Sequence, residues 1–114
     1  MSIEQTDVVD AIGVEKATGS VVLTISDHLS WDEEGQHLLL LQGKINTYLA
    51  FIESGDLEEA YADAANRRRV ISVVAEHEPS AEAERFLGVA RETVEGAGIE
   101  FRHTVRQEGV ATDD

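Results

Sequence analysis

The sequence predicts an α+β protein, built as a two-layer α/β sandwich in which a small mixed sheet carries a long helix and a second helix on one face. Short runs of β-branched residues alternate between apolar and polar side chains, which is typical of strands. Two longer segments repeat apolar residues at spacings of three and four, which is typical of helices. In chain order these segments read ββαβαβ, and helices that cover one face of a small sheet form a second layer.

The first two strands are predicted to form a β-hairpin. Residues 8–14 are rich in β-branched side chains, and residues 21–25 alternate so that Val21, Leu23 and Ile25 share one face. The turn between them, residues 15–20, contains Gly19, which can adopt a positive φ.

A long helix is predicted to follow. Residues 30–33 read Ser-Trp-Asp-Glu and match the S-x-x-E capping box, with acidic side chains in the first turn, where the helix dipole favours negative charge. Gly55 supplies the C-terminal stop. The stripe expected to face the core consists of Leu38, Leu41, Ile45, Tyr48, Leu49 and Ile52.

The second half of the chain is predicted to contain two more strands around a second helix. Residues 56–66 form a short helix or a turn-rich connection, and residues 70–75 form a strand. Ser80 caps the second helix, which ends at residues 96–98. Residues 99–105 alternate and form the last strand. The third and fourth strands either pair in parallel through a right-handed crossover or are separated by another strand.

The length of 114 residues corresponds to one domain. We expect a flexible N-terminus over residues 1–6, a single α/β domain over residues 7–106 and a flexible acidic tail over residues 107–114. The chain has no cysteine, which excludes disulfides, thiolate-bound metals and a thiol nucleophile.

The charge balance limits the partners. Nine Lys and Arg residues against 23 Asp and Glu give a net charge of −14, which argues against binding to nucleic acid or to an anionic membrane. The N-terminus has no signal-peptide pattern, and every uncharged run is far shorter than the roughly 20 residues that span a bilayer, so we expect a cytoplasmic protein. The excess of acid and the scarcity of Lys fit either adaptation to salt or a GC-rich genome.

The only basic run is formed by residues 67–69, Arg-Arg-Arg. Three positive charges in so acidic a chain are too few for a phosphate-binding surface. The run is instead interpreted as a solvated strand start that balances Asp63, Glu58 and Glu59, or as a contact with an acidic patch of another subunit.

Two stretches of the chain resemble a known family. They are residues 21–32, Val-Val-Leu-Thr-Ile-Ser-Asp-His-Leu-Ser-Trp-Asp, and the helical segment 37–55. Both are similar to a family of small, uncharacterised bacterial proteins known only as a domain of unknown function. The resemblance extends over roughly residues 7–105. It implies one independent cytoplasmic unit and carries no activity, substrate or catalytic residue.

The densest group of polar residues lies where the second strand leads into the long helix. Asp27, His28, Trp31, Asp32 and His37 are candidate ligand-binding residues, because ligands of α/β proteins often bind at helix N-termini. Each residue also has a structural explanation, namely capping, hydrogen bonding within the loop, or closure of the core.

A metal site formed by His28, Glu33 and His37 is a second hypothesis, because Glu33 and His37 are four residues apart on one helix face and zinc accepts His and carboxylate ligands. Glu33 and His37 also fit an ordinary surface pair. The HExxH, GxSxG, P-loop and dinucleotide-binding motifs are all missing from the sequence, so no catalytic residue and no cofactor is assigned, and an enzyme is not favoured.

The other two histidines are less suggestive of a site. His77 precedes a proline in a loop and is expected to be solvated. His103 shares a strand face with Phe101 and Val105, so we expect a partly buried, hydrogen-bonded side chain whose protonation lowers stability in acid.

The long helix carries apolar residues outside its main stripe, namely Leu39, Leu40 and Phe51. Leu40 and Phe51 are eleven residues apart and therefore lie on one side. Either the sheet and the segment around Leu57 and Tyr61 wrap around this side, or it is exposed and pairs with another chain.

The leading hypothesis is a small, non-enzymatic protein-interaction module that acts as a homodimer or binds an unidentified protein partner. The alternative is a small-molecule or metal-binding domain, possibly catalytic, centred on residues 27–37.

Overall fold

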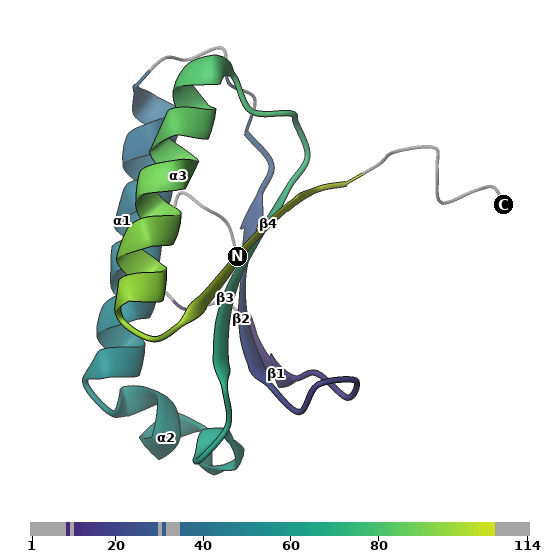
Figure 1. Cartoon of the computed structure of the whole chain (residues 1–114), viewed down its shortest axis with the longest axis vertical. Coiled ribbons are helices and arrows are strands. Elements are labelled where there is room, and N and C mark those ends of the chain that lie inside the picture. The colour runs from purple at the N-terminus through teal and green to yellow at the C-terminus, as the bar shows by residue number, and fades with distance from the viewer. Residues whose placement is uncertain (1–8, 10, 30, 32–34, 107–114) are drawn as a thin grey trace, which may run out of the picture.

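Two helices lie side by side on one face of a four-stranded sheet, which confirms the predicted two-layer α+β architecture (Figure 1). The computed structural model describes residues 9, 11–29, 31 and 35–106. The predicted flexible ends, residues 1–6 and 107–114, lie outside the described residues.

The sheet has the strand order β1-β2-β3-β4. Its strands are β1 (Ala11–Val14), β2 (Val21–Asp27), β3 (Arg69–Ala75) and β4 (Glu100–Val105). β1 and β2 pair antiparallel, as expected for a hairpin, while β2–β3 and β3–β4 pair in parallel. The last two strands are therefore neighbours, which settles the alternative that the sequence left open.

Three α-helices and a short 3-10 helix connect and cover these strands. α1 (Gln36–Glu53) and α3 (Ala81–Gly96) form the second layer. α2 (Asp56–Ala60) and the 3-10 helix η1 (Ala62–Ala64) occupy the segment predicted as a short helix or connection. Helices α1 and α3 thus cover one face of the sheet, and no helix of the described chain covers the other (Figure 1).

The start of α1 differs from the prediction. The helix begins at Gln36, its N-cap is Gly35 with a φ of 82°, and its first turn contains no acidic residue. A helix requires a φ near −60°, so the left-handed φ of Gly35 ends the helical path there. The prediction that α1 begins at the capping box is therefore wrong. Three residues of that box, Ser30, Asp32 and Glu33, lie outside the described residues.

The other helix boundaries agree with the sequence. Ser80 caps α3, because its Oγ accepts a hydrogen bond from the Ala83 N–H at 3.1 Å. Gly55 follows the end of α1 with a φ of 91°, and Gly98 follows α3 with a φ of 84°. A left-handed glycine after a helix end is the conformation that the stop signals predicted.

The core lies between the helices and the covered face of the sheet. β2 alternates as expected, with Val21, Leu23 and Ile25 buried. Across from them, α1 buries Leu41, Ile45, Tyr48 and Ile52 of its predicted stripe, whereas Leu38 and Leu49 are half-buried. The Tyr48 hydroxyl donates to the carbonyl of Thr24 at 2.8 Å, which fixes α1 to β2.

Candidate functional site

A buried pair of side chains, Asp27 and His37, joins the end of β2 to the first turn of α1. The alternation of β2 places Asp27 on the same face as its apolar residues, and its side chain meets His37 of α1. The Nε2 atom of His37 lies 2.7 Å from Oδ1 and 2.6 Å from Oδ2 of Asp27. The two residues are only 1% and 2% exposed, so this pair is shielded from solvent.

Two neighbouring residues hold the Asp27–His37 pair in place. The backbone N–H of Leu29 donates to Oδ1 of Asp27 at 3.2 Å, which orients the carboxylate. The Trp31 ring stacks on the imidazole of His37, with ring centroids 3.5 Å apart and planes 15° apart. The Nε1 atom of Trp31 is buried and finds no hydrogen-bond acceptor among the described residues.

The structure therefore brings together three of the five predicted ligand-binding residues, Asp27, Trp31 and His37. The fourth, His28, is exposed. The fifth, Asp32, lies outside the described residues.

The predicted metal site is only partly described. His37 faces Asp27, and His28 is exposed, whereas Glu33 lies outside the described residues. Among the residues that the structure does describe, no group of three or more His, Asp or Glu side chains is arranged to hold a metal ion. The hypothesis that includes Glu33 stays a prediction.

His103 lies on the same sheet face as Asp27. The parallel register pairs Ile25 with Val73 and Val73 with His103, so the imidazole belongs to the covered face of the sheet. His103 lies two residues before Val105, the last residue of β4. Its side chain is half-buried, and its Nε2 atom is buried without a partner in the described part of the chain. The predicted burial is therefore confirmed, whereas the described residues offer no hydrogen-bond partner to the Nε2 atom of this side chain.

The pKa of His103 is lowered from its ordinary value of 6.5, and burial is the main cause because it disfavours the charged imidazolium. The positive charge of Arg91 also lowers this pKa, while the carboxylates of Asp27 and Glu78 raise it. His77, in contrast, is exposed as the sequence predicted.

The sequence reasoning missed one buried cation. Lys44 is fully buried on α1, and its Nζ lies 5.9 Å from the centroid of the Tyr48 ring. Lys44 follows His37 by seven residues and precedes Tyr48 by four, so the three polar side chains share one helix face. A polar residue at such a position within an apolar stripe is the signal that could have identified it.

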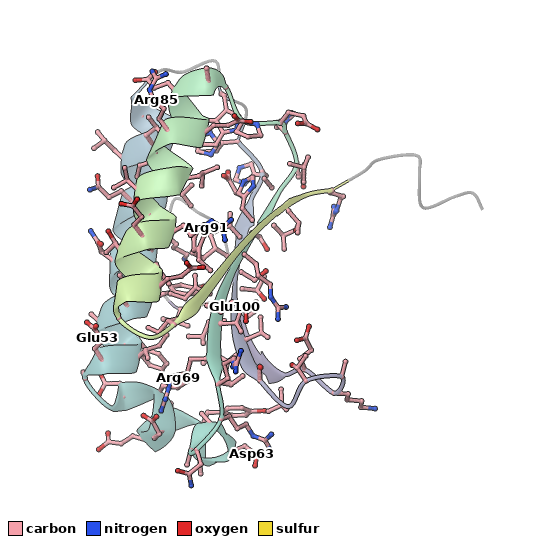
Figure 2. All side chains as sticks on the ribbon, viewed as in Figure 1. Glu53, Asp63, Arg69, Arg85, Arg91 and Glu100 are labelled. Carbon is pink, nitrogen blue, oxygen red and sulfur yellow. The ribbon has the colours of Figure 1, made fainter. Side chains whose placement is uncertain are left out.

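The arginine run is engaged with the protein's own surface. Arg67 donates to the carbonyls of Gly19 at 2.9 Å and of Asp63 at 2.6 Å. Arg69 forms an ion pair with Glu58 beside α2, where Figure 2 labels it. The interpretation that the run balances nearby acids of the chain is confirmed for these two residues.

The three predicted interface residues differ in exposure. Leu39 is 68% exposed, which makes it the most exposed large apolar side chain of the described chain. Leu40 and Phe51 are half-buried and pack against the core. Phe51 also lines a groove between α1, α2 and β1, which we call the Phe51 groove. Its lining is formed by Val9, Ile12, Thr47, Ala50, Phe51, Ser54, Asp56 and Ala60.

A second hollow lies between α1 and α3. It is lined by uncharged residues that include Leu49, Phe86 and Val89, of which Val89 is 62% exposed. α1 therefore has an apolar hollow on each flank.

The fold and these sites define a small two-layer α+β domain with a buried His–Asp pair and apolar grooves along its long helix. No helix of the described residues is long and apolar enough to cross a membrane. The chain belongs to the Family of unknown function (DUF6572), which matches residues 1–107 and confirms the resemblance found in the sequence. No curated protein and no solved structure matches the chain.

Proposed function

We propose that the protein is a cytoplasmic protein-interaction module that acts as a homodimer and uses the Phe51 groove as its contact surface. The observation that carries this proposal is a nearly uncharged groove beside the edge strand β1, whereas no β1 residue lines the hollow between α1 and α3. Among the residues that the structure describes, Asp56 is the only charged one that lines the groove, in a chain whose net charge is −14. Two copies of so acidic a chain repel each other, so the contact is most favourable where the surface is nearly uncharged.

The groove also offers apolar surface to a partner. Phe51 and Ile12 are half-buried, so each keeps part of its side chain available for contact. Leu40 precedes Thr47 of the groove by seven residues, which places it on the same side of α1. Burial of exposed apolar area contributes about 25 cal/mol per Å², and aromatic side chains supply much of that area in interfaces.

Replacing Phe51 with Asp tests this proposal. The substitution places a negative charge in the groove, and we expect F51D to be a folded monomer under conditions in which the wild type is a dimer. The measurement is the molar mass by size-exclusion chromatography with light scattering, combined with circular dichroism to confirm the fold.

Val89→Asp is the matched control, because it adds the same charge at an exposed apolar residue of α3, outside the Phe51 groove. We expect V89D to remain a dimer. A wild type that is monomeric at all concentrations refutes the homodimer, and an F51D variant that remains dimeric refutes the use of this groove.

The second candidate function is small-molecule or metal binding at the end of β2, and the unpaired polar atoms of that region favour it. The Nε1 of Trp31 and the Nε2 of His103 are buried without partners among the residues described, at the sheet end that carries Asp27. A buried polar atom without a hydrogen bond costs about 1–3 kcal/mol, and a bound polar ligand relieves that cost.

A thermal-shift screen tests this function with Zn²⁺, Ni²⁺ and orthophosphate on the wild type and on His103→Gln. A ligand that bonds His103 raises the melting temperature of the wild type more than that of the variant. If no probe shifts the wild type, and metal analysis of the purified protein finds none bound, these ligand classes are excluded.

A further inference from the structure

We infer that β1 of one copy pairs antiparallel with β1 of a second copy, which joins the two sheets into one continuous sheet across a two-fold axis. This inference rests on the proposed homodimer and specifies how its copies meet. The two edge strands of the sheet are β1 and β4. A side chain covers an outward backbone group of β4, and we therefore place the contact between copies at β1.

The hydrogen-bonding groups of β1 can be assigned a direction from the hairpin. The N–H of Glu15 donates to the carbonyl of Ser20 at 2.8 Å, which continues the register that pairs Val14 with Val21. Hydrogen-bonded and non-hydrogen-bonded pairs alternate along an antiparallel ladder. Gly13 therefore bonds to β2, whereas the backbone groups of Ile12 and Val14 point away from the sheet.

A hydrogen bond of β2 independently shows that the backbone groups of Val14 do not bond to β2. The N–H of Val21 donates to the carbonyl of Arg68 at 2.8 Å, toward β3 and not toward Val14 opposite it. Among the described residues, no backbone group pairs with the outer edge of β1, since β1 ends the strand order.

The β4 edge is protected in a way that β1 is not. The N–H of Arg106 donates to the carbonyl of Ala75 at 2.7 Å, so the alternate residues of β4, including Phe101, present their backbone groups outward. The outward carbonyl of Phe101 accepts a hydrogen bond from Arg91 of α3 at 2.9 Å. Figure 2 shows Arg91 between α3 and β4. A charged side chain over an edge carbonyl is one way in which proteins block strand pairing.

The side chains of β1 fit a second copy of β1. The strand reads Ala-Ile-Gly-Val and contains no charge, so two copies meet there without repulsion between charges of the strand itself. Ile12 lies on the covered face, opposite Leu23, and lines the Phe51 groove. A partner strand added at this edge continues the same alternation, so its apolar side chains lie on the covered face, beside the Phe51 groove.

In one register of the two β1 strands, every outward N–H and C=O group of Ile12 and Val14 forms a hydrogen bond with the other copy. This register pairs Ile12 of each copy with Val14 of the other and places Gly13 opposite Gly13 on the two-fold axis. The central pair is then a non-hydrogen-bonded pair, in which Cα atoms approach to about 4.5 Å. Gly13 has no side chain there, and even an added Cβ would meet no atom within 4 Å in the isolated chain.

Amide hydrogen exchange of the wild-type protein, followed by NMR below and above the dimerisation midpoint, tests the pairing directly. We expect the exchange of the Ile12 and Val14 amides to slow by about tenfold or more on dimerisation, because they become hydrogen-bonded only in the dimer. Gly13 is the internal control, because its amide is bonded to β2 in both states and its exchange changes far less.

Val14→Pro and Val14→Ala provide a second test. Proline removes the outward N–H without removing a bond to β2, whereas alanine keeps that N–H and shortens the side chain. We expect V14P to dimerise at least about tenfold more weakly than V14A. The dimer contains residue 14 twice, so the proline removes two hydrogen bonds between the copies. If V14P fails to fold, the exchange experiment alone decides.

The outcomes separate the inference from the proposal on which it rests. A dimer in which Ile12 and Val14 exchange as fast as in the monomer refutes the pairing of β1 and leaves the homodimer standing. A chain that is monomeric at every concentration refutes both.

Discussion

At the scale of single residues, the Asp27–His37 pair is a short polar contact between two fully buried side chains. Both side chains are removed from water, and such burial is tolerated because the carboxylate and the imidazole satisfy each other. The pair ties the last residue of β2 to the first turn of α1. It therefore fixes the position at which the long helix meets the sheet.

Removal of His37 is expected to be costly. His37→Ala leaves a buried, unpaired carboxylate and removes the ring on which Trp31 stacks, so the free energy of unfolding falls by about 3–5 kcal/mol. His28→Ala is the matched control on an exposed neighbour, with a change within about 0.5 kcal/mol. Urea unfolding at pH 7 measures both, and equal losses in the two variants contradict a stabilising role of the pair.

His103 makes stability depend on pH. Its pKa in the folded state lies below the ordinary value of 6.5, so below pH 6.5 the unfolded chain binds more protons at this residue than the folded chain does. Its contribution is fully present above pH 6.5 and is lost as the pH falls toward the lowered pKa.

The corresponding measurement is urea unfolding between pH 5 and 7.5 for the wild type and for His103→Gln, which cannot be protonated in this range. The wild type should lose more stability on acidification than the variant does. Parallel pH profiles would show that His103 titrates alike in both states.

At the scale of elements, the sequence predicted helix boundaries correctly where the contact that sets the boundary lies within the same helical turn. The Ser80 cap and the glycine stops act within one helical turn, and the structure confirms them. The start of α1 was misplaced, because the S-x-x-E pattern is a local signal, whereas the observed start follows a left-handed Gly35. The helix then begins where His37 can reach Asp27, a contact that the capping pattern does not encode.

The same distinction explains what could be predicted of the candidate site. Asp27, Trp31 and His37 were grouped because the end of a strand and the start of the next helix are close in the chain. His103 was not included, because only the parallel register of β2, β3 and β4 brings it to the same end of the sheet. Lys44 was not identified, although it is a single polar residue within the apolar stripe of α1, where the structure buries it fully.

At the scale of the whole molecule, the charge is organised by pairing. Arg67, Arg69, Arg91, Arg102 and Arg106 each form an ion pair with an acid of the chain. Arg102 of β4 reaches Glu15 at the end of the hairpin, and this hydrogen bond is the main reason that the pKa of Glu15 is lowered. Most of the described arginines are thus compensated by acids of the same chain.

Arg91 covers the outward carbonyl of Phe101 on β4, and this contact affects how many copies of the chain can join through their sheet edges. A subunit with two open strand edges can add neighbours at both and polymerise into a filament without limit. A subunit in which one edge is blocked against strand pairing and the other pairs with its own copy would complete its assembly with a single partner. In the proposed dimer, Arg91 would therefore limit the number of copies although it contacts β4, at the opposite edge of the sheet from the β1 contact.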